Sequence, residues 1–251
     1  MMRTLAVAAL LLATSGFEGM AGAKPVVLTG GLIVDGSGAP PWRGWLAMDR
    51  DRITGIGQGT APARVTKGAT ITDVKGQAIA PGFVNMLSWA TESLLVDGRA
   101  QSDIRQGVTL EIMGEGNSMG PLNPEMKRLA AQRQDDIKYP ITWTTLGDYL
   151  TTLERKGIAP NVASFVGHTS VRVHEVGESD VDPTPQQLAR MQGLVRAAMN
   201  EGALGLGTSM IYAPAAYAET PELIALAKAS AACGGMYISH MRSEGDRIEA
   251  A

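Results

Sequence analysis

Segments with strand and helix patterns alternate along the chain after Pro81-Gly82. Two helices are signalled by an N-cap threonine followed by a proline at the first helical position, in Thr184-Pro185 and Thr220-Pro221. This alternation favours a parallel sheet, because parallel neighbours need a long crossover that is usually a helix. The segments expected to be strands are 83–87, 108–113, 161–166, 204–208 and 236–239, with a further helix around 146–155.

Such strands suit either an open, doubly wound α/β sheet or a (β/α)8 barrel. No G-x-G-x-x-G follows an early strand, since Gly205-Leu206-Gly207 does not extend to that motif. The sequence also contains no G-x-x-x-x-G-K-[ST]. A P-loop is therefore excluded, and a dinucleotide-binding fold lacks its signature.

The segment from residue 24 to residue 82 has a different pattern. Short β-rich runs are separated by turns that contain Gly and Asp, which indicates a small antiparallel sheet or sandwich. The runs are 26–29, 32–36, 46–48, 70–74 and 77–80. We therefore expect part of a small β-domain at 24–82 and the strand–helix region at 83–251.

The first 23 residues have the pattern of a secretory signal peptide. Arg3 supplies a positive charge, residues 5–13 form an uninterrupted apolar run, and Ala21-Gly22-Ala23 offers a cleavage site before Lys24. The apolar run is too short to span a bilayer, which needs about 20 residues. We expect an exported protein, periplasmic or secreted, with no membrane span once the signal is removed. The alternative is a buried N-terminal strand or helix.

Composition narrows the classes of partner and of metal site. The 251 residues carry a formal net charge of −3, so nothing indicates a nucleic-acid partner or binding to an anionic membrane surface. The single cysteine, Cys233, excludes an intrachain disulfide and an all-cysteine zinc site, and we expect it to be a small buried hydrophobe. The three histidines are His168, His174 and His240, of which His174 is expected in a solvated loop.

Several segments together resemble one family. Residues 30–38, 52–57 and 80–85 resemble the opening strands of the amidohydrolase superfamily and the junction where its small β-domain enters a barrel. More specific matches resemble its D-aminoacylase, or N-acyl-D-amino-acid deacylase, branch. They are Gly167-His168 with Val171-Arg172, Gly202-Ala203-Leu204-Gly205-Leu206 with Tyr212, and Tyr237-Ile238-Ser239-His240-Met241-Arg242-Ser243-Glu244.

The resemblance implies a partial (β/α)8 barrel of about five strand–helix units, preceded by part of a β-sandwich. It also implies hydrolysis of a linear C–N amide bond, with one divalent metal ion, expected to be Zn²⁺. This chemistry needs a Lewis acid that polarises the carbonyl and lowers the pKa of a bound water. It also needs a carboxylate that carries the proton to the leaving amine. The implied partner is a small-molecule N-acyl amino acid or a related amide.

Two positions depart from the pattern that the resemblance implies. The superfamily has a His-x-His pair at the end of the first barrel strand, where this chain has Leu87-Ser88-Trp89. D-aminoacylases have a metal-binding cysteine just after the second strand, where this chain has Glu115 at or beside that place. A carboxylate is a competent zinc ligand. We therefore expect a single metal ion held by His240 and Glu115, and we expect Trp89 to fill the space of a missing histidine. The structural alternatives are that His240 makes only a hydrogen bond and that the Glu115 carboxylate caps a helix or loop.

Four further residues are candidates for contact with the substrate, because they lie near expected strand ends or carry a guanidinium group that can bind a carboxylate bidentately. They are His168, Arg172, Tyr212 and Arg242. Each has a structural alternative. His168 would make a structural hydrogen bond, Tyr212 would be a packed loop aromatic, and either arginine would pair with Glu244 or Glu175.

Chain length bears on how much of a barrel is present. A full barrel takes about 250 residues, and about 170 follow Gly82. We therefore expect the N-terminal part of a longer protein, with the family's second metal histidine and its general-base aspartate beyond residue 251. The favoured function is amide hydrolysis of the N-acyl-D-amino-acid deacylase type. The alternatives are a non-catalytic relative that has lost its metal centre, and a cyclic-amide hydrolase, which the absent histidine pair disfavours.

Overall fold

The computed structural model describes residues 24–251, so the signal peptide expected at 1–23 lies outside the described residues. The chain divides into two compact units, Met1–Pro81 and Gly82–Ala251. Within residues 24–251, no helix combines the length and the apolar character that crossing a membrane requires.

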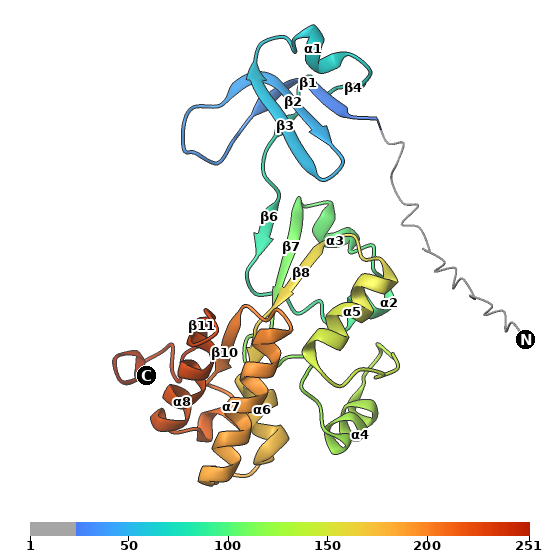
Figure 1. Ribbon diagram of the computed structural model, residues 1–251. Coiled ribbons are helices and arrows are strands. Elements are labelled where there is room, and N and C mark those ends of the chain that lie inside the picture. The colour runs from blue at the N-terminus through green and yellow to red at the C-terminus, as the bar shows by residue number, and fades with distance from the viewer. Residues whose placement is uncertain (1–23) are drawn as a thin grey trace, which may run out of the picture. The chain divides into compact units, whose positions relative to one another are not determined.

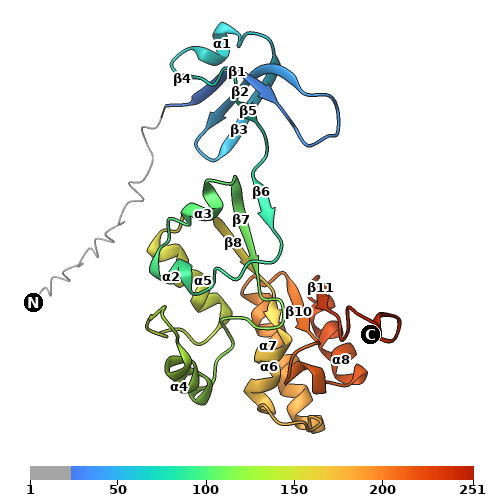
Figure 2. The ribbon, with the colours of Figure 1, turned by 180° about the vertical axis from the view of Figure 1, so that it is seen from behind.

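The first unit is built on a five-stranded sheet in the order β3-β2-β1-β4, with β5 also paired to β1 (Figures 1 and 2). Strands β1 to β3 pair antiparallel as expected, but β4 and β5 pair parallel with β1. Helix α1 lies in the connection between β3 and β4, which lets the chain return and run in the direction of β1. The bounds are β1 Val26–Ile33, β2 Trp42–Asp49, β3 Arg52–Gln58, α1 Ala63–Thr66, β4 Thr70–Asp73 and β5 Ala78–Ile79.

Strand β1 is continuous where the sequence predicted two strands, 26–29 and 32–36. Gly30 has a positive φ of 76°, and the register with β2 shifts between Thr29 and Gly31. Glycine adopts this conformation without a steric penalty, so the strand carries an irregularity and pairing resumes after it. Val27, Trp45 and Ala47 form a buried hydrophobic cluster in this unit, where Ile33 and Leu46 are also buried.

The second unit is a mixed α/β fold whose strands all pair in parallel, in the orders β6-β7-β8 and β9-β10-β11. A single residue, Phe165, separates β8 from β9, and its N–H donates to the Met113 carbonyl at 2.8 Å. The five predicted strand segments are confirmed, with 161–166 broken at Phe165. The bounds are β6 Phe83–Asn85, β7 Val108–Met113, β8 Asn161–Ser164, β9 Val166–Gly167, β10 Gly205–Ser209 and β11 Met236–His240.

Helices fill the connections between these strands. Figures 1 and 2 both show α6, α7 and α8 beside β10 and β11. The α-helices are α2 Ser93–Val96, α3 Gln101–Ile104, α4 Pro124–Arg133, α5 Leu146–Lys156, α6 His168–Glu175, α7 Pro185–Asn200 and α8 Thr220–Ala231, and the 3-10 helices are η1 Ala215–Tyr217 and η2 Ile248–Ala250.

Helix α5 shows how the sequence sets a helix and its buried face. Thr145 and Asp148 form a capping box at its start, and Gly157, with a φ of 76°, ends it in the left-handed conformation. Leu146, Tyr149 and Leu153 recur at helical spacing and are buried in the main core. Each buried side chain of this size contributes about 1.5–3 kcal/mol. The core also takes Val166, Leu206 and Leu226 from β9, β10 and α8.

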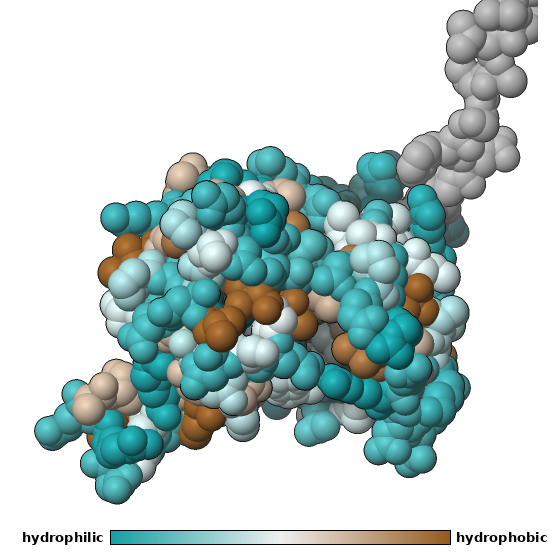
Figure 3. Space-filling model, turned by 90° about the horizontal axis from the view of Figure 1, so that it is seen from below, coloured by the Kyte–Doolittle hydropathy of each residue, from teal (hydrophilic) through white to brown (hydrophobic). Residues whose placement is uncertain are grey.

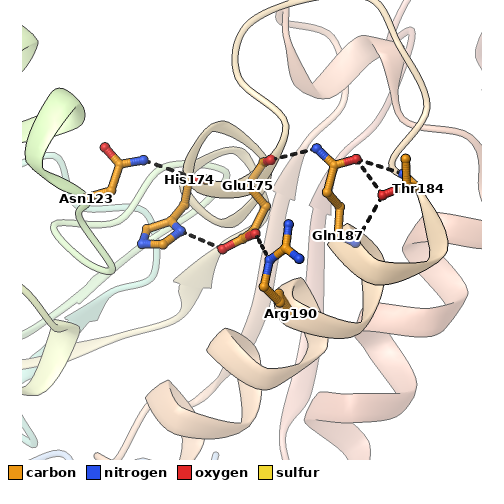
Figure 4. Close-up of polar contacts among 6 residues, drawn as sticks. All are labelled: Asn123, His174, Glu175, Thr184, Gln187 and Arg190. Atoms are coloured by element: carbon orange, nitrogen blue, oxygen red, sulfur yellow. Dashed lines mark hydrogen bonds and ion pairs between the residues drawn. The ribbon is translucent and has the colours of Figure 1, made fainter.

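Polar contacts join α6 to α7 and to the segment before α4 (Figure 4). The Glu175 carboxylate pairs with His174 Nδ1 at 2.9 Å and with Arg190 Nε at 2.5 Å. Gln187 Nε2 donates to the Glu175 carbonyl, and Asn123 Nδ2 donates to the His174 carbonyl. His174 therefore lies half-buried in the last turn of α6, and its placement in a solvated loop was wrong.

Two further local predictions are corrected and one is confirmed. Thr184 caps α7 through a capping box with Gln187, as predicted. Helix α8 begins one residue earlier than predicted, at Thr220, with Glu219 as its N-cap. Cys233 lies past the end of α8 and is exposed, because the helix stops at Ala231 before the turn to β11. It is not a buried hydrophobe.

The outer strands of the second unit present apolar side chains to solvent. Phe83 and Val84 of β6, and Met236 and Tyr237 of β11, are all exposed. Each of these two strands has one hydrogen-bonded neighbour among the described residues. Figure 3 shows apolar residues set within a mostly hydrophilic surface on the side seen from below. An exposed edge of this kind is a site for pairing with further strands.

Gly193 gives a test of the helical packing. It lies inside α7, and a Cβ placed on it meets no heavy atom within 4 Å. Gly193→Ala should raise the free energy of unfolding by about 1 kcal/mol, because alanine restricts the unfolded backbone and has the higher helix propensity. Thermal unfolding of the whole protein measures the change. Gly147→Ala in α5 is the matched control, since its Cβ would lie 3.0 Å from Glu201 Cβ. Equal gains at both positions would contradict the packing described.

Candidate functional site

Two of the predicted site residues meet at the carboxyl ends of parallel strands. Glu115 follows β7 by two residues, and His240 is the last residue of β11. Glu115 Oε2 lies 3.7 Å from His240 Nδ1, and the two side chains are 15% and 22% exposed. The structure thus places a carboxylate and an imidazole together in a partly buried position. Chemistry in parallel α/β folds is built at this end of the strands.

Glycines allow the loop that carries Glu115 to reach β10. Gly114 and Gly116 have φ angles of 93° and 77°, which side-chain-bearing residues rarely adopt. A Cβ on Gly207 of β10 would lie 2.3 Å from the Gly114 carbonyl oxygen and 3.2 Å from Glu115 Cα. The loop therefore packs directly against the backbone of β10, which has no side chain at that position.

His240 lies between two carboxylates and against an aromatic ring. Its Nε2 is 3.2 Å from Glu244 Oε1, on the side opposite Glu115. The Tyr212 ring packs edge-on against the imidazole, with centroids 5.4 Å apart and an interplanar angle of 82°. Tyr212 is 59% exposed. Of the residues expected to contact a substrate, it is the one that the structure shows beside the Glu115–His240 pair.

The Arg242 guanidinium is engaged with backbone carbonyls. Nη1 donates to the Ala216 carbonyl at 3.1 Å, and Nη2 donates to the Ala218 carbonyl at 2.6 Å. These carbonyls belong to η1 and the residue that follows it, so Arg242 holds the segment between Tyr212 and α8. The alternative pairing of Arg242 with Glu244 or Glu175 is not what the structure shows.

His168 and Arg172 form a buried network with a residue that the sequence analysis did not single out. Glu222, in the first turn of α8, accepts hydrogen bonds on both carboxylate oxygens. His168 Nε2 lies 2.8 Å from Oε1, and Arg172 Nη1 lies 2.5 Å from Oε2. Arg172 Nη2 also donates to the Val181 carbonyl. All three charged or polar side chains are buried, and Arg172 has neither Glu175 nor Glu244 as its partner.

The segment in place of the His-x-His pair holds no metal-binding side chain. Leu87 is exposed, and Trp89 is 60% exposed. Ser88 is buried between them, and its Oγ accepts from the Ala90 N–H. Trp89 therefore does not fill a vacated pocket, because its ring extends into solvent.

Two buried polar residues, one in β7 and one in β10, each have a side-chain oxygen without a partner among the described residues. Glu111 of β7 is fully buried, with Oε2 accepting from Asn85 Nδ2 at 3.2 Å and Oε1 without a partner. Ser209, the last residue of β10, has a buried hydroxyl without a partner. Sequence reasoning missed Ser209, because it lies in no motif and only the strand register reveals its position.

The buried network predicts a large effect on stability. Glu222→Gln leaves the Arg172 charge buried without its counter-charge, and the free energy of unfolding should fall by about 3–5 kcal/mol. Glu219→Gln is the control, because Glu219 lies three residues away and is exposed. Chemical denaturation of the whole protein compares the two. Losses of equal size would mean that the Glu222 carboxylate does not hold α6 and α8 together.

The comparisons with known proteins agree on one group of relatives. No protein-family model matches the chain. It is 34% identical over 230 residues to a D-aminoacylase of Alcaligenes xylosoxydans xylosoxydans, covering 90% of this chain and 46% of the relative. It is 31% identical over 227 residues to an N-acyl-D-aspartate deacylase of the same organism, covering 88% of this chain and 44% of that one.

Solved structures give the same result. An N-acyl-D-glutamate deacylase from Bordetella bronchiseptica, crystallised with zinc and a phosphonate inhibitor, superposes with a TM-score of 0.76 at 30% identity, covering 92% of this chain and 48% of that chain. A D-aminoacylase superposes with a TM-score of 0.75 at 29% identity, covering 90% of this chain and 47% of that chain. The chain thus spans about half the length of the relatives it matches. In sequence and in fold, it corresponds to the N-terminal portion of the D-aminoacylase and N-acyl-D-amino-acid deacylase branch of the amidohydrolases, as its motifs predicted.

Proposed function

We propose that the protein is a metal-dependent hydrolase of linear C–N amide bonds that acts on an N-acyl amino acid or a related small amide. The observation that carries the proposal is the pairing of Glu115 with His240 at the carboxyl ends of β7 and β11. The relatives support it, since they are a D-aminoacylase and deacylases of N-acyl-D-aspartate and N-acyl-D-glutamate.

We also propose that the strands β6 to β11 and their helices form the first part of a (β/α)8 barrel. Both parallel ladders follow the order of the chain, and one residue separates β8 from β9. Consecutive parallel strands joined by helices are the repeating unit of that fold. The two outer strands would then receive their remaining neighbours from elsewhere in the whole protein.

The donors at the Glu115–His240 pair fit a divalent cation such as zinc. Zinc accepts carboxylate oxygen and imidazole nitrogen as ligands, and the 3.7 Å between Glu115 Oε2 and His240 Nδ1 allows both to face one ion. When bound, the cation supplies a Lewis acid that polarises an amide carbonyl and lowers the pKa of water. Residues 24–251 contain no group of three or more His, Cys, Asp or Glu side chains placed to hold a metal. A further histidine of the whole protein would therefore complete the set.

The side chains around Glu115 and His240 would orient His240 and hold the surrounding backbone. His240 Nε2 lies 3.2 Å from Glu244 Oε1, so a proton on Nε2 would leave the Nδ1 lone pair free for a cation shared with Glu115. A carboxylate behind a ligating histidine fixes its tautomer and raises its basicity. Tyr212 lines the approach to the pair, whereas His168, Arg172 and Arg242 hold the surrounding backbone. The general-base aspartate would lie beyond residue 251, and the signal pattern at 1–23 would direct the protein to the periplasm or the medium.

The second candidate is a non-catalytic protein of the same fold that has lost its metal centre. The replacement of a histidine pair by Leu87-Ser88-Trp89 favours it, because neither Leu87 nor Trp89 offers a ligand atom. The motif match at residues 239–242, which includes His240, and the contact of His240 with Glu115 argue against it. Metal content separates the two candidates.

The whole protein should contain about one tightly held Zn²⁺ per chain and should hydrolyse N-acyl-D-amino acids. His240→Ala and Glu115→Gln should each weaken Zn²⁺ binding enough that dialysis removes the metal, and the activity should be lost with it, because each variant lacks a principal ligand. Glu115→Cys should keep the metal, because a thiolate is also a zinc ligand. Elemental analysis after dialysis, with an assay of released amine, measures both quantities.

His174→Ala is the matched control, because this histidine packs on Glu175 in α6 and is not in contact with the pair. It should retain the metal. A wild-type protein that contains no metal would contradict the hydrolase proposal and favour the non-catalytic candidate. Metal that persists equally in His240→Ala and His174→Ala would show that the site lies elsewhere.

A further inference from the structure

We propose that Ser209 is a positioning residue of the Glu115–His240 site, and that its hydroxyl donates a hydrogen bond to the Glu115 carboxylate when a divalent cation is bound. The inference rests on the proposed function, because it concerns the state with the cation in place. Ser209 lies in none of the motifs that carry the resemblance to the deacylases.

The strand register places Ser209 on the same side of the sheet as the site. Ser209 of β10 is paired with His240 of β11 in parallel register. Side chains alternate between the two faces of a strand, so paired residues in neighbouring parallel strands project from the same face. Gly207, two residues earlier on that face, is where the Glu115 loop rests on β10. The Ser209 side chain therefore points to the face on which Glu115 and His240 meet.

The backbone of Gly116 lies close to the Ser209 side chain. A Cβ built on Gly116 would lie 2.3 Å from Ser209 Cβ and 3.1 Å from its Oγ. Gly116 directly follows Glu115, so the serine side chain lies against the backbone that carries the carboxylate. No other side-chain position on β10 is both on this face and polar, because Gly205 and Gly207 are glycines.

The hydroxyl itself is buried and has no partner. Ser209 is 3% exposed, and its Oγ makes no hydrogen bond within residues 24–251. A buried hydroxyl without a partner is unfavourable, and such groups call for a specific partner. Glu115 Oε2 is 3.7 Å from His240 Nδ1, beyond hydrogen-bond distance, so this carboxylate has acceptor capacity. Ligating carboxylates are commonly held by a hydrogen bond from a neighbouring group. The Ser209 hydroxyl, beside Glu115, can supply that hydrogen bond.

The experiment measures the affinity of the whole apoprotein for Zn²⁺ by competition with a coloured chelator, without reference to activity. Ser209→Ala should weaken binding by about 10–100-fold, the usual cost of removing such a supporting hydrogen bond. Ser230→Ala is the matched control, because Ser230 is equally buried but lies in α8, where its Oγ contacts Met199 Sδ. It should leave the affinity unchanged. Circular dichroism and thermal unfolding establish that both variants fold like the wild type.

A double-mutant cycle tests whether Ser209 acts through Glu115. In a Glu115→Ala background, Ser209→Ala should cause no further loss of residual Zn²⁺ affinity, since its acceptor is gone. Additive losses would show that the serine acts independently and would overturn the inference. So would a wild type that binds Zn²⁺ while Ser209→Ala and Ser230→Ala bind it alike, an outcome that leaves the hydrolase proposal intact. A wild type that binds no Zn²⁺ overturns both.

Discussion

The arrangement of the second unit's polar residues depends on one close approach between two backbones. Gly207 lets the loop at Gly114 rest on β10 without a side chain between them. Strand β7 is not a hydrogen-bonded neighbour of β10 or β11, so the loop after β7 must pass the 161–167 segment to reach them. Glu115 meets His240 because of that passage. The proximity of two polar residues is thus set by a residue that has no side chain, and even a methyl group at position 207 would displace the loop.

Residues predicted from the sequence to bind substrate instead hold the segment that carries Tyr212. This segment runs from the end of β10 to the start of α8. Arg242, two residues after β11, donates to carbonyls of this segment. Glu222, just beyond the segment, is fixed to α6 by His168 and Arg172. The charged groups of Arg172 and Glu222 thus fix the start of α8 to α6, and both side chains are buried. The aromatic ring beside His240 owes its position to these contacts.

The sequence predicted features that depend on local order and missed those that depend on distant neighbours. Strand β7 and the capped start of α7 follow from residues adjacent in the chain, and both were confirmed. The Glu115–His240 juxtaposition followed from family motifs rather than from spacing. Glu222 was missed because its partners lie 50 and 54 residues away. The expected burial of Trp89 was wrong for a related reason. Whether a side chain is buried depends on which distant residues pack against it, and the sequence does not show these.

The exposed turn after α8 has a practical consequence. Cys233 is the single thiol of the sequence, and it lies three residues before the start of β11, whereas His240 ends that strand. A maleimide dye would therefore attach at one known position. The four residue steps of β11, at about 3.3 Å each, separate its two ends by roughly 13 Å, and the dye would lie beyond the end opposite the imidazole. At that separation, a coloured transition-metal ion bound at His240 would quench the dye's fluorescence, so the molecule carries its own built-in reporter of metal occupancy.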